Sequence, residues 1–168
     1  GDQSTTTNVQ SDQPNQFIVR AAGGFRLATN PLQTTGVIMV ANASAWSSLS
    51  DVNSKEHFRD LAGEDLLAKI AGMPVREWNY KAQGPSIRHL GPTAQDFHAA
   101  FGLGEDSLRI STIDADGVSL AAMKALEVRT RDLAGIASTF DERVAALAGE
   151  TGELRARPAR LEALLAKR

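Results

Sequence analysis

The stretch that decides the fold lies near the C-terminus and reads LEVRTRDLAGIASTFDERVAALAGETGELRARPARL, residues 126–161. Large apolar residues recur in it every seven positions, at Leu126, Leu133, Phe140, Leu147, Leu154 and Leu161. A helix packed on a globular domain drifts out of a seven-residue repeat over this length, because an α-helix has 3.6 residues per turn. The strict heptad repeat therefore predicts a long helix that packs against copies of itself.

The six residues above form one seam of this helix. The second seam lies three positions before each of them and is mostly small or polar: Met123, Thr130, Ala137, Val144, Thr151 and Pro158. Such residues do not specify a dimer, so the seam alone leaves the number of helices open. In a parallel arrangement Glu150 would face Arg155 of the next chain. Arg157 would likewise face Glu162. Both pairs are opposite in sign and favour parallel, in-register packing, each by about 0.2–1 kcal/mol.

The helical region is predicted to span residues 114–168, with Asp114 or Asp116 as its N-terminal cap. Its heptad part would be roughly 60 Å long, which is too long to pack on so small a domain. Pro158 removes a helix hydrogen bond and clashes with the preceding turn, so fraying or a kink is expected near Leu154.

The rest of the chain mixes short strands and short helices, which predicts the α+β fold class. Residues 1–15 are polar and predict a flexible lead-in. Residues 16–49 contain two strand-like runs that need partners, and they predict a β-rich stalk end. Residues 50–113 predict a small α+β unit, with helices at 63–73 and 92–102 and strands at 75–81, 87–90 and 108–113.

Composition and charge exclude several classes of function. The net charge of −2 provides no basic surplus for nucleic acid. The sequence contains no run of about 18 apolar residues, so no membrane-spanning helix is predicted. The N-terminus does not resemble a signal peptide. Gly1 in place of Met predicts a fragment or a processed chain. The chain has no cysteine, and the spacing of His57, His89 and His98 matches no common zinc motif, so we expect no metal and no cofactor.

The segment LSDVNSKEHF, residues 49–58, places Ser50 five positions before Lys55. A serine hydroxyl is a weak nucleophile that needs a base. A lysine amine can serve only when neutral, whereas an unperturbed lysine has a pKa of about 10.4. A Ser/Lys dyad therefore needs a desolvated lysine or a neighbouring cation. In the alternative interpretation Ser50 caps a helix and Lys55 is solvated beside Glu56.

A resemblance favours the dyad. Three motifs carry it: Ser50-Asp51-x-x-x-Lys55-Glu56, Pro74-Val75-x-x-Trp78-x-Tyr80 and His89-x-Gly91-x-x-Ala94-Gln95-Asp96. Over about residues 46–135 the chain resembles the C-terminal intramolecular chaperone of phage tail spikes and tail fibres, the S74 self-cleaving peptidase family of endosialidase tailspikes. The resemblance implies a parallel homotrimer at the end of a triple β-helical stalk, with the C-terminal helices wrapped together.

The resemblance also implies the chemistry. Ser50 would be the nucleophile, Lys55 the general base, and the bond between Leu49 and Ser50 the cleavage site. Asp51, His89 and Gln95 are candidates for supporting the dyad, although His89 could equally be a packed polar residue.

The implied partner is the N-terminal fibre or spike portion of the same protein. The implied location is a phage virion tail fibre, from which the cleaved chaperone is released, or the cell surface if the protein is bacterial. Two alternatives stay open: a structural trimerisation domain of a fibre or adhesin that does not cleave, and a receptor-binding tip that stays attached. A free-standing enzyme is disfavoured, because the sequence offers no second set of acid, base and nucleophile.

Overall fold

The computed structural model describes residues 8–166, and the predicted lead-in at 1–15 therefore lies partly outside the described residues. The described chain is α+β, with small antiparallel sheets and one long C-terminal helix, which confirms the α+β class and the long helix of the prediction. It divides into two compact units, Gly1–Asp60 and Leu61–Arg168. Each unit is described by itself below.

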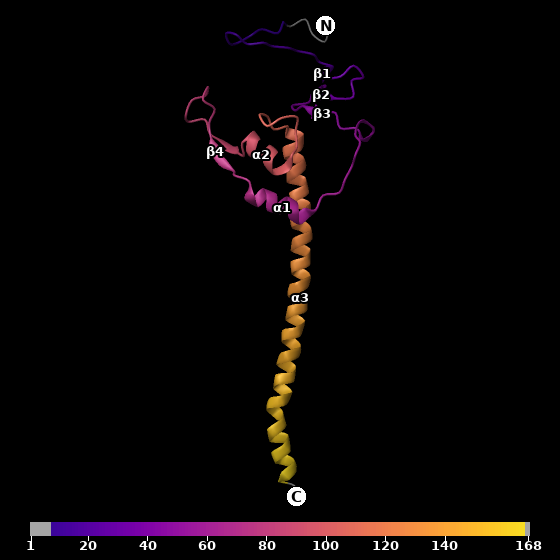
Figure 1. The fold of residues 1–168 in the computed structure, drawn as a ribbon, viewed down its shortest axis with the longest axis vertical. Coiled ribbons are helices and arrows are strands. Elements are labelled where there is room, and N and C mark those ends of the chain that lie inside the picture. The colour runs from indigo at the N-terminus through magenta and orange to yellow at the C-terminus, as the bar shows by residue number, and fades with distance from the viewer. Residues whose placement is uncertain (1–7, 167–168) are drawn as a thin grey trace. The chain divides into compact units, whose positions relative to one another are not determined.

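The first unit contains a three-stranded antiparallel sheet with the order β1-β2-β3 (Figure 1). Its strands are β1 (Gly24–Ala28), β2 (Gly36–Val40) and β3 (Ser47–Ser48). The β1–β2 register runs from Gly24 opposite Val40 to Ala28 opposite Gly36. Phe25 and Trp46 pack with their ring centroids 6.3 Å apart. The central strand β2, GVIMV, carries the β-branched residues that favour a strand, whereas β3 consists of two serines.

The second unit combines three helices with one hairpin. Its elements are α1 (Gly63–Gly72), β4 (Arg76–Trp78), β5 (His89–Gly91), α2 (Ala94–Phe101) and α3 (Thr112–Leu165). Both predicted short helices are confirmed, and the first two predicted strands form but are shorter. Thr93 caps α2 by accepting a hydrogen bond from the Asp96 N–H, and Gly102 ends the helix with a φ of 63°.

The strand predicted at 108–113 is wrong. The Asp106 carboxylate accepts hydrogen bonds from the N–H groups of Leu108 and Arg109, at 2.7 and 3.1 Å, and so occupies donors that a strand would use. Residues 112 and 113 instead open α3. The predicted helix cap is also wrong, because Ser111 occupies the cap position and Asp114 lies in the first turn.

The helix α3 continues through Pro158 to Leu165, so the expected fraying near Leu154 is not seen. A proline removes one hydrogen bond and costs about 3 kcal/mol in a helix interior. The neighbouring residues are mainly Arg, Ala, Leu and Glu, which are strong helix formers and keep the helix intact on both sides.

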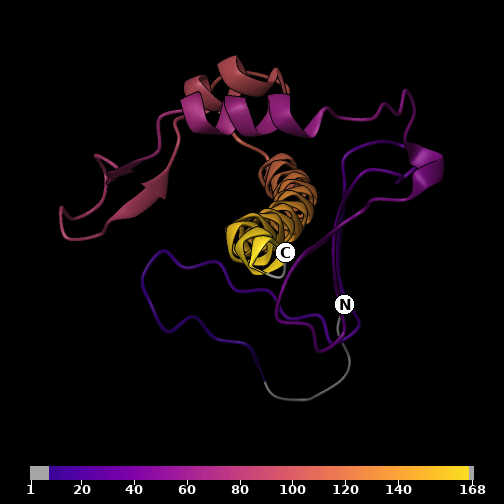
Figure 2. The ribbon, with the colours of Figure 1, turned by 90° about the horizontal axis from the view of Figure 1, so that it is seen from below.

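The helices α1 and α2 lie on the same side of α3 (Figure 2). Each of the three helices contributes one buried residue: Leu66 from α1, Phe97 from α2 and Ala125 from α3. No other apolar residue of the described chain is buried. An isolated globular protein of 17.9 kDa exposes roughly 8,000 Å² of surface, whereas this chain exposes 14271 Å². One copy of the chain therefore lacks a core of ordinary size.

Gly63 allows α1 to approach α3 closely. A Cβ atom at this position would lie 2.9 Å from Cβ of Ala125, which is closer than real carbon contacts. We expect Gly63→Ala to destabilise this packing by about 1–3 kcal/mol, because the helices must separate. Thermal unfolding measures the change. Gly117→Ala is the control, since nothing lies within 4 Å of that position; equal melting temperatures for the two variants would contradict the prediction.

Candidate functional site

Residues 50–55 form a tight turn that is built by Asp51. The Asp51 carboxylate accepts hydrogen bonds from the backbone N–H of Asn53 at 2.8 Å and from its side-chain amide at 2.9 Å. This caps a single 3₁₀ turn, Val52–Ser54, which the N–H of Lys55 closes by donating to the Val52 carbonyl at 3.1 Å. The turn reverses the chain and brings Lys55 back toward Ser50.

The two predicted dyad residues are in contact. Lys55 Nζ donates a hydrogen bond to Ser50 Oγ over 2.6 Å, and both residues are exposed in the single chain. The cap of the turn is Asp51, not Ser50, which removes one part of the alternative interpretation. The serine hydroxyl is left free to point at the lysine amine. Whether this pair is catalytic stays a prediction.

The residue before the serine belongs to the sheet of the same unit. Ser48 and Ser47 pair with Val37 and Ile38 across β2 and β3. The pairing extends one step further, because the N–H of Leu49 donates to the carbonyl of Gly36 at 3.0 Å. The predicted cleavage site thus lies between the end of a strand and the start of a turn.

The role of Gly36 was not predicted from the sequence. It is 13 residues from its partner Leu49, and only the strand register brings the two together. The one feature of the sequence that could have indicated this role is the position of Gly36 directly before the apolar run at 37–40.

In the second unit, Trp78, Tyr80 and His89 form an aromatic cluster. Trp78 stacks on His89 with ring centroids 4.8 Å apart, and Tyr80 meets both rings edge-on, at 4.8 and 5.3 Å. His89 Nε2 lies 2.8 Å from Oε1 of Gln83, a partner that sequence analysis missed. The histidine is therefore a packed residue with a polar contact.

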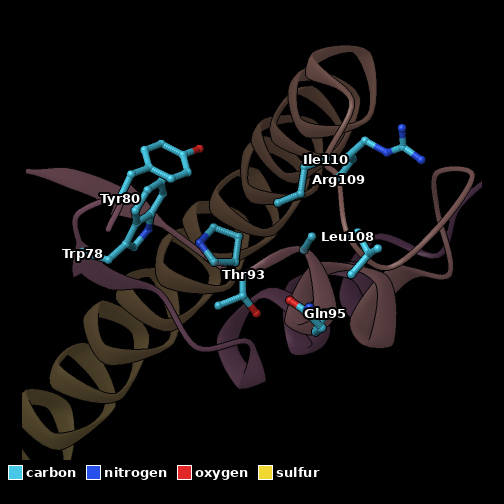
Figure 3. A pocket seen from close by; sticks show the side chains of 9 residues that line it. Trp78, Tyr80, Thr93, Gln95, Leu108, Arg109 and Ile110 are labelled. Atoms are coloured by element: carbon cyan, nitrogen blue, oxygen red, sulfur yellow. The ribbon is translucent and has the colours of Figure 1, made fainter. Parts of the chain in front are cut away.

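A pocket of about 500 Å³ lies beside this cluster, and Figure 3 shows the side chains around it. Trp78 and Tyr80 form one side, Gln95 from α2 another, and the loop before α3 contributes Leu108 and Ile110. His89 and Gln95 lie in the second unit, whereas Ser50 and Lys55 lie in the first. Their support of the dyad therefore stays a prediction.

The other histidines have separate surroundings. His57 lies beside Glu56, with 3.5 Å between Nε2 and Oε1, and both side chains are exposed. Nδ1 of His98 lies 2.9 Å from the carbonyl oxygen of Leu103, just beyond the end of α2. His98 thus contacts the backbone beyond the end of α2, whereas His57 is exposed beside its sequence neighbour.

Two of the ion pairs in the second unit lower the pKa of their carboxyl groups. Arg109 and the N–H of Leu108 hold the pKa of Asp106 below its usual value and shape the loop before α3. Arg129 on α3 holds the pKa of Glu64 on α1 below its usual value, with Nε and Oε1 3.1 Å apart. Both pairs are exposed, so solvent screening keeps their contribution to stability small.

The heptad stripe of α3 is exposed along its length. The exposed fraction is 58% for Leu133, 65% for Phe140 and 63% for Leu154, and the remaining residues of the predicted stripe are similarly exposed. By contrast, α1 packs against the face that carries Ala125. The second unit therefore leaves the heptad stripe of α3 uncovered.

No helix in the described part of the chain is both long enough and apolar enough to cross a membrane. Comparison with curated proteins gives no match, and comparison with solved structures gives none either. A family model described as the chaperone of endosialidase, Peptidase_S74, does match, over residues 50–102. The matched segment is narrower than the predicted 46–135, and it begins at Ser50. Residues 50–102 of this chain therefore match the Peptidase_S74 family, the chaperone of endosialidase.

Proposed function

We propose that this chain is the C-terminal chaperone of a tail fibre or tailspike, which trimerises through α3 and then cuts itself between Leu49 and Ser50. The observation that carries the proposal is the 2.6 Å contact between Lys55 Nζ and Ser50 Oγ. The contact is made by the first residue of the matched family segment, which is also the residue expected to begin the released fragment.

The reaction needs the opposite direction of this hydrogen bond, with the Ser50 hydroxyl as donor and the Lys55 amine as acceptor. A neutral Lys55 amine accepts the hydroxyl proton while Oγ of Ser50 attacks the carbonyl carbon of Leu49. The peptide C–N bond breaks, and the lysine ammonium returns the proton to the departing Ser50 amine. Water then hydrolyses the ester between Leu49 and Oγ. The products are a carboxylate at Leu49 and a chain that begins at Ser50 with a free amine.

Assembly supplies what one chain lacks. Within residues 8–166 three apolar residues are buried and the heptad stripe is exposed, so the chain needs partners, and parallel copies of α3 would bury that stripe. The same assembly would have to desolvate Lys55 or bring a cation near it, since only then is its neutral form accessible. Self-cleavage is thus tied to the trimer.

Such a module solves a folding problem of fibre stalks. A stalk built from contacts between chains nucleates slowly, because its pairings are distant in sequence. A C-terminal trimer raises the effective concentration of the three chains and fixes their register. Once the chaperone has left, an unfolded stalk can no longer refold readily. The lifetime of the stalk is then set by its rate of unfolding and not by an equilibrium.

The partner in this proposal is the fibre or spike portion of the same protein, and the location is a virion tail fibre. The exposure of Lys55 in the single chain favours one competing function, a structural trimerisation domain with an inert dyad. The two functions differ in whether the peptide bond between Leu49 and Ser50 is cut.

The experiment compares mass under native and denaturing conditions. We expect native mass spectrometry to find three copies, and a denaturing gel to separate residues 1–49 from residues 50–168. N-terminal sequencing of the larger piece should begin Ser50-Asp51-Val52. A trimer that stays full length would support the structural alternative, and a monomer would contradict both functions.

A further inference from the structure

We infer that the pairing of β3 with β2 positions the bond to be cut, so that the chain cleaves itself only when this sheet has formed. The inference rests on the proposed self-cleavage at Leu49. The geometry that points to it is the hydrogen bond from the N–H of Leu49 to the carbonyl of Gly36, 3.0 Å long. In this role Gly36 is a positioning residue that acts through Leu49.

The hydrogen bond restricts the carbonyl that Ser50 attacks. The peptide group between Ser48 and Leu49 is planar, and its N–H is held by Gly36. The direction of the Leu49 carbonyl then depends on the two backbone dihedrals of Leu49 alone. The strand pairs Val37–Ser48 and Ile38–Ser47 fix the chain just before this point.

The other side of the bond is held independently. Asp51 caps the 3₁₀ turn, and the turn sets the position of the Ser50 hydroxyl against Lys55. The nucleophile is therefore placed by a local turn, whereas its target is placed by a sheet. A reaction between them needs both to be in register, since misplacing reacting atoms by about 1 Å can cost 100-fold in rate.

Gly36 joins all three strands. It pairs with Ala28 of β1 on one side, and its carbonyl accepts from Leu49 on the other. Its φ of +136° is a conformation that other residues rarely adopt, and a Cβ atom there would collide with the carbonyl oxygen of Leu27. An error in β1–β2 pairing would therefore be passed on to Leu49.

The strand β3 has only two residues, both exposed, so it is not expected to pair stably on its own. Its pairing would depend on the rest of the sheet and on whatever stalk continues from it. The cut would then follow completion of the sheet, and a chain with unpaired strands would keep its chaperone.

Two variants of Leu49 test the hydrogen bond directly. Leu49→Pro removes the N–H donor, and proline still suits the extended conformation of the preceding residue. Leu49→Ala removes the same side chain but keeps the donor, and it is the reference. Within the trimeric fraction isolated by native chromatography, we expect Leu49→Pro to cleave roughly 100-fold more slowly than Leu49→Ala.

Gly36→Ala provides a second, independent test, with Gly23→Ala as its control because nothing lies within 4 Å of Gly23. We expect slow cleavage in trimers of the first variant and a rate like that of the original protein in the second. The pH at which the rate is half-maximal should not change in Gly36→Ala, because the turn that holds Lys55 is untouched.

The outcomes separate this inference from the proposed function. If Leu49→Pro and Leu49→Ala cleave at equal rates, the sheet does not position the bond, although self-cleavage stands. A changed pH midpoint in Gly36→Ala would also overturn the inference, because the dyad itself would then be altered. If the original protein is never cut, the proposed function fails first.

Discussion

The variant Ser50→Ala is expected to assemble into a trimer and to stay full length on a denaturing gel. Without the hydroxyl no ester can form between Leu49 and residue 50, and the loss of a covalent nucleophile lowers rates by about 10⁴-fold or more. Lys55→Met should have a similar effect, because it keeps the length of the side chain but removes the amine that lies 2.6 Å from Ser50 Oγ.

Controls for this prediction lie close by. Ser54→Ala removes an exposed hydroxyl from the same turn, and Lys81→Met removes an exposed amine from the other unit. Both variants should be cut like the original chain. Time courses on denaturing gels, with intact mass of the trimer, give the rates. Two fragments from Ser50→Ala, separated at the same bond, would show that the assigned nucleophile is wrong.

The second large effect is expected at the heptad stripe. Phe140→Asp places a carboxylate in each chain at a position that trimerisation would bury. Truncating a buried phenylalanine alone costs about 3–5 kcal/mol, and a buried charge without a partner adds to this. We expect a monomer by light scattering, and we expect cleavage to be lost with the trimer although Ser50 and Lys55 are unchanged.

Ser138→Asp is the matched control, because it adds the same charge two residues away, off both predicted seams. This variant should remain trimeric and should be cut. If Phe140→Asp remained trimeric, the helices would not associate through this stripe. If it became monomeric and was still cut, cleavage would not depend on assembly, and the proposed coupling between the two would be wrong.

Together these experiments separate three parts of the molecule that the structure keeps distinct. The turn at Ser50 carries the proposed chemistry, the sheet around Gly36 carries the proposed positioning, and the stripe on α3 carries the assembly. Each can be changed without a substitution in the others, so a failure can be assigned to one of them.

The sequence by itself determined the features that depend on neighbouring residues. The heptads predicted the long helix because helical periodicity is local, although the fraying expected near Leu154 is not seen. The helix predicted at 92–102 is α2, and its ends are set by local caps at Thr93 and Gly102, which act within one turn. The contact between Ser50 and Lys55 is also local, because a turn of only three residues closes it.

The strand expected at 108–113 is wrong for a local reason, because the Asp106 carboxylate binds backbone donors two and three residues away and α3 begins at Thr112. Only the tertiary structure decided the rest. The hydrogen bond between Leu49 and Gly36 depends on strand register. The packing of Gly63 on Ala125 depends on how two helices meet. Both contacts join residues that are far apart in the sequence, so their separation in space is set by the fold, whereas periodicity and caps act within a few residues of the chain.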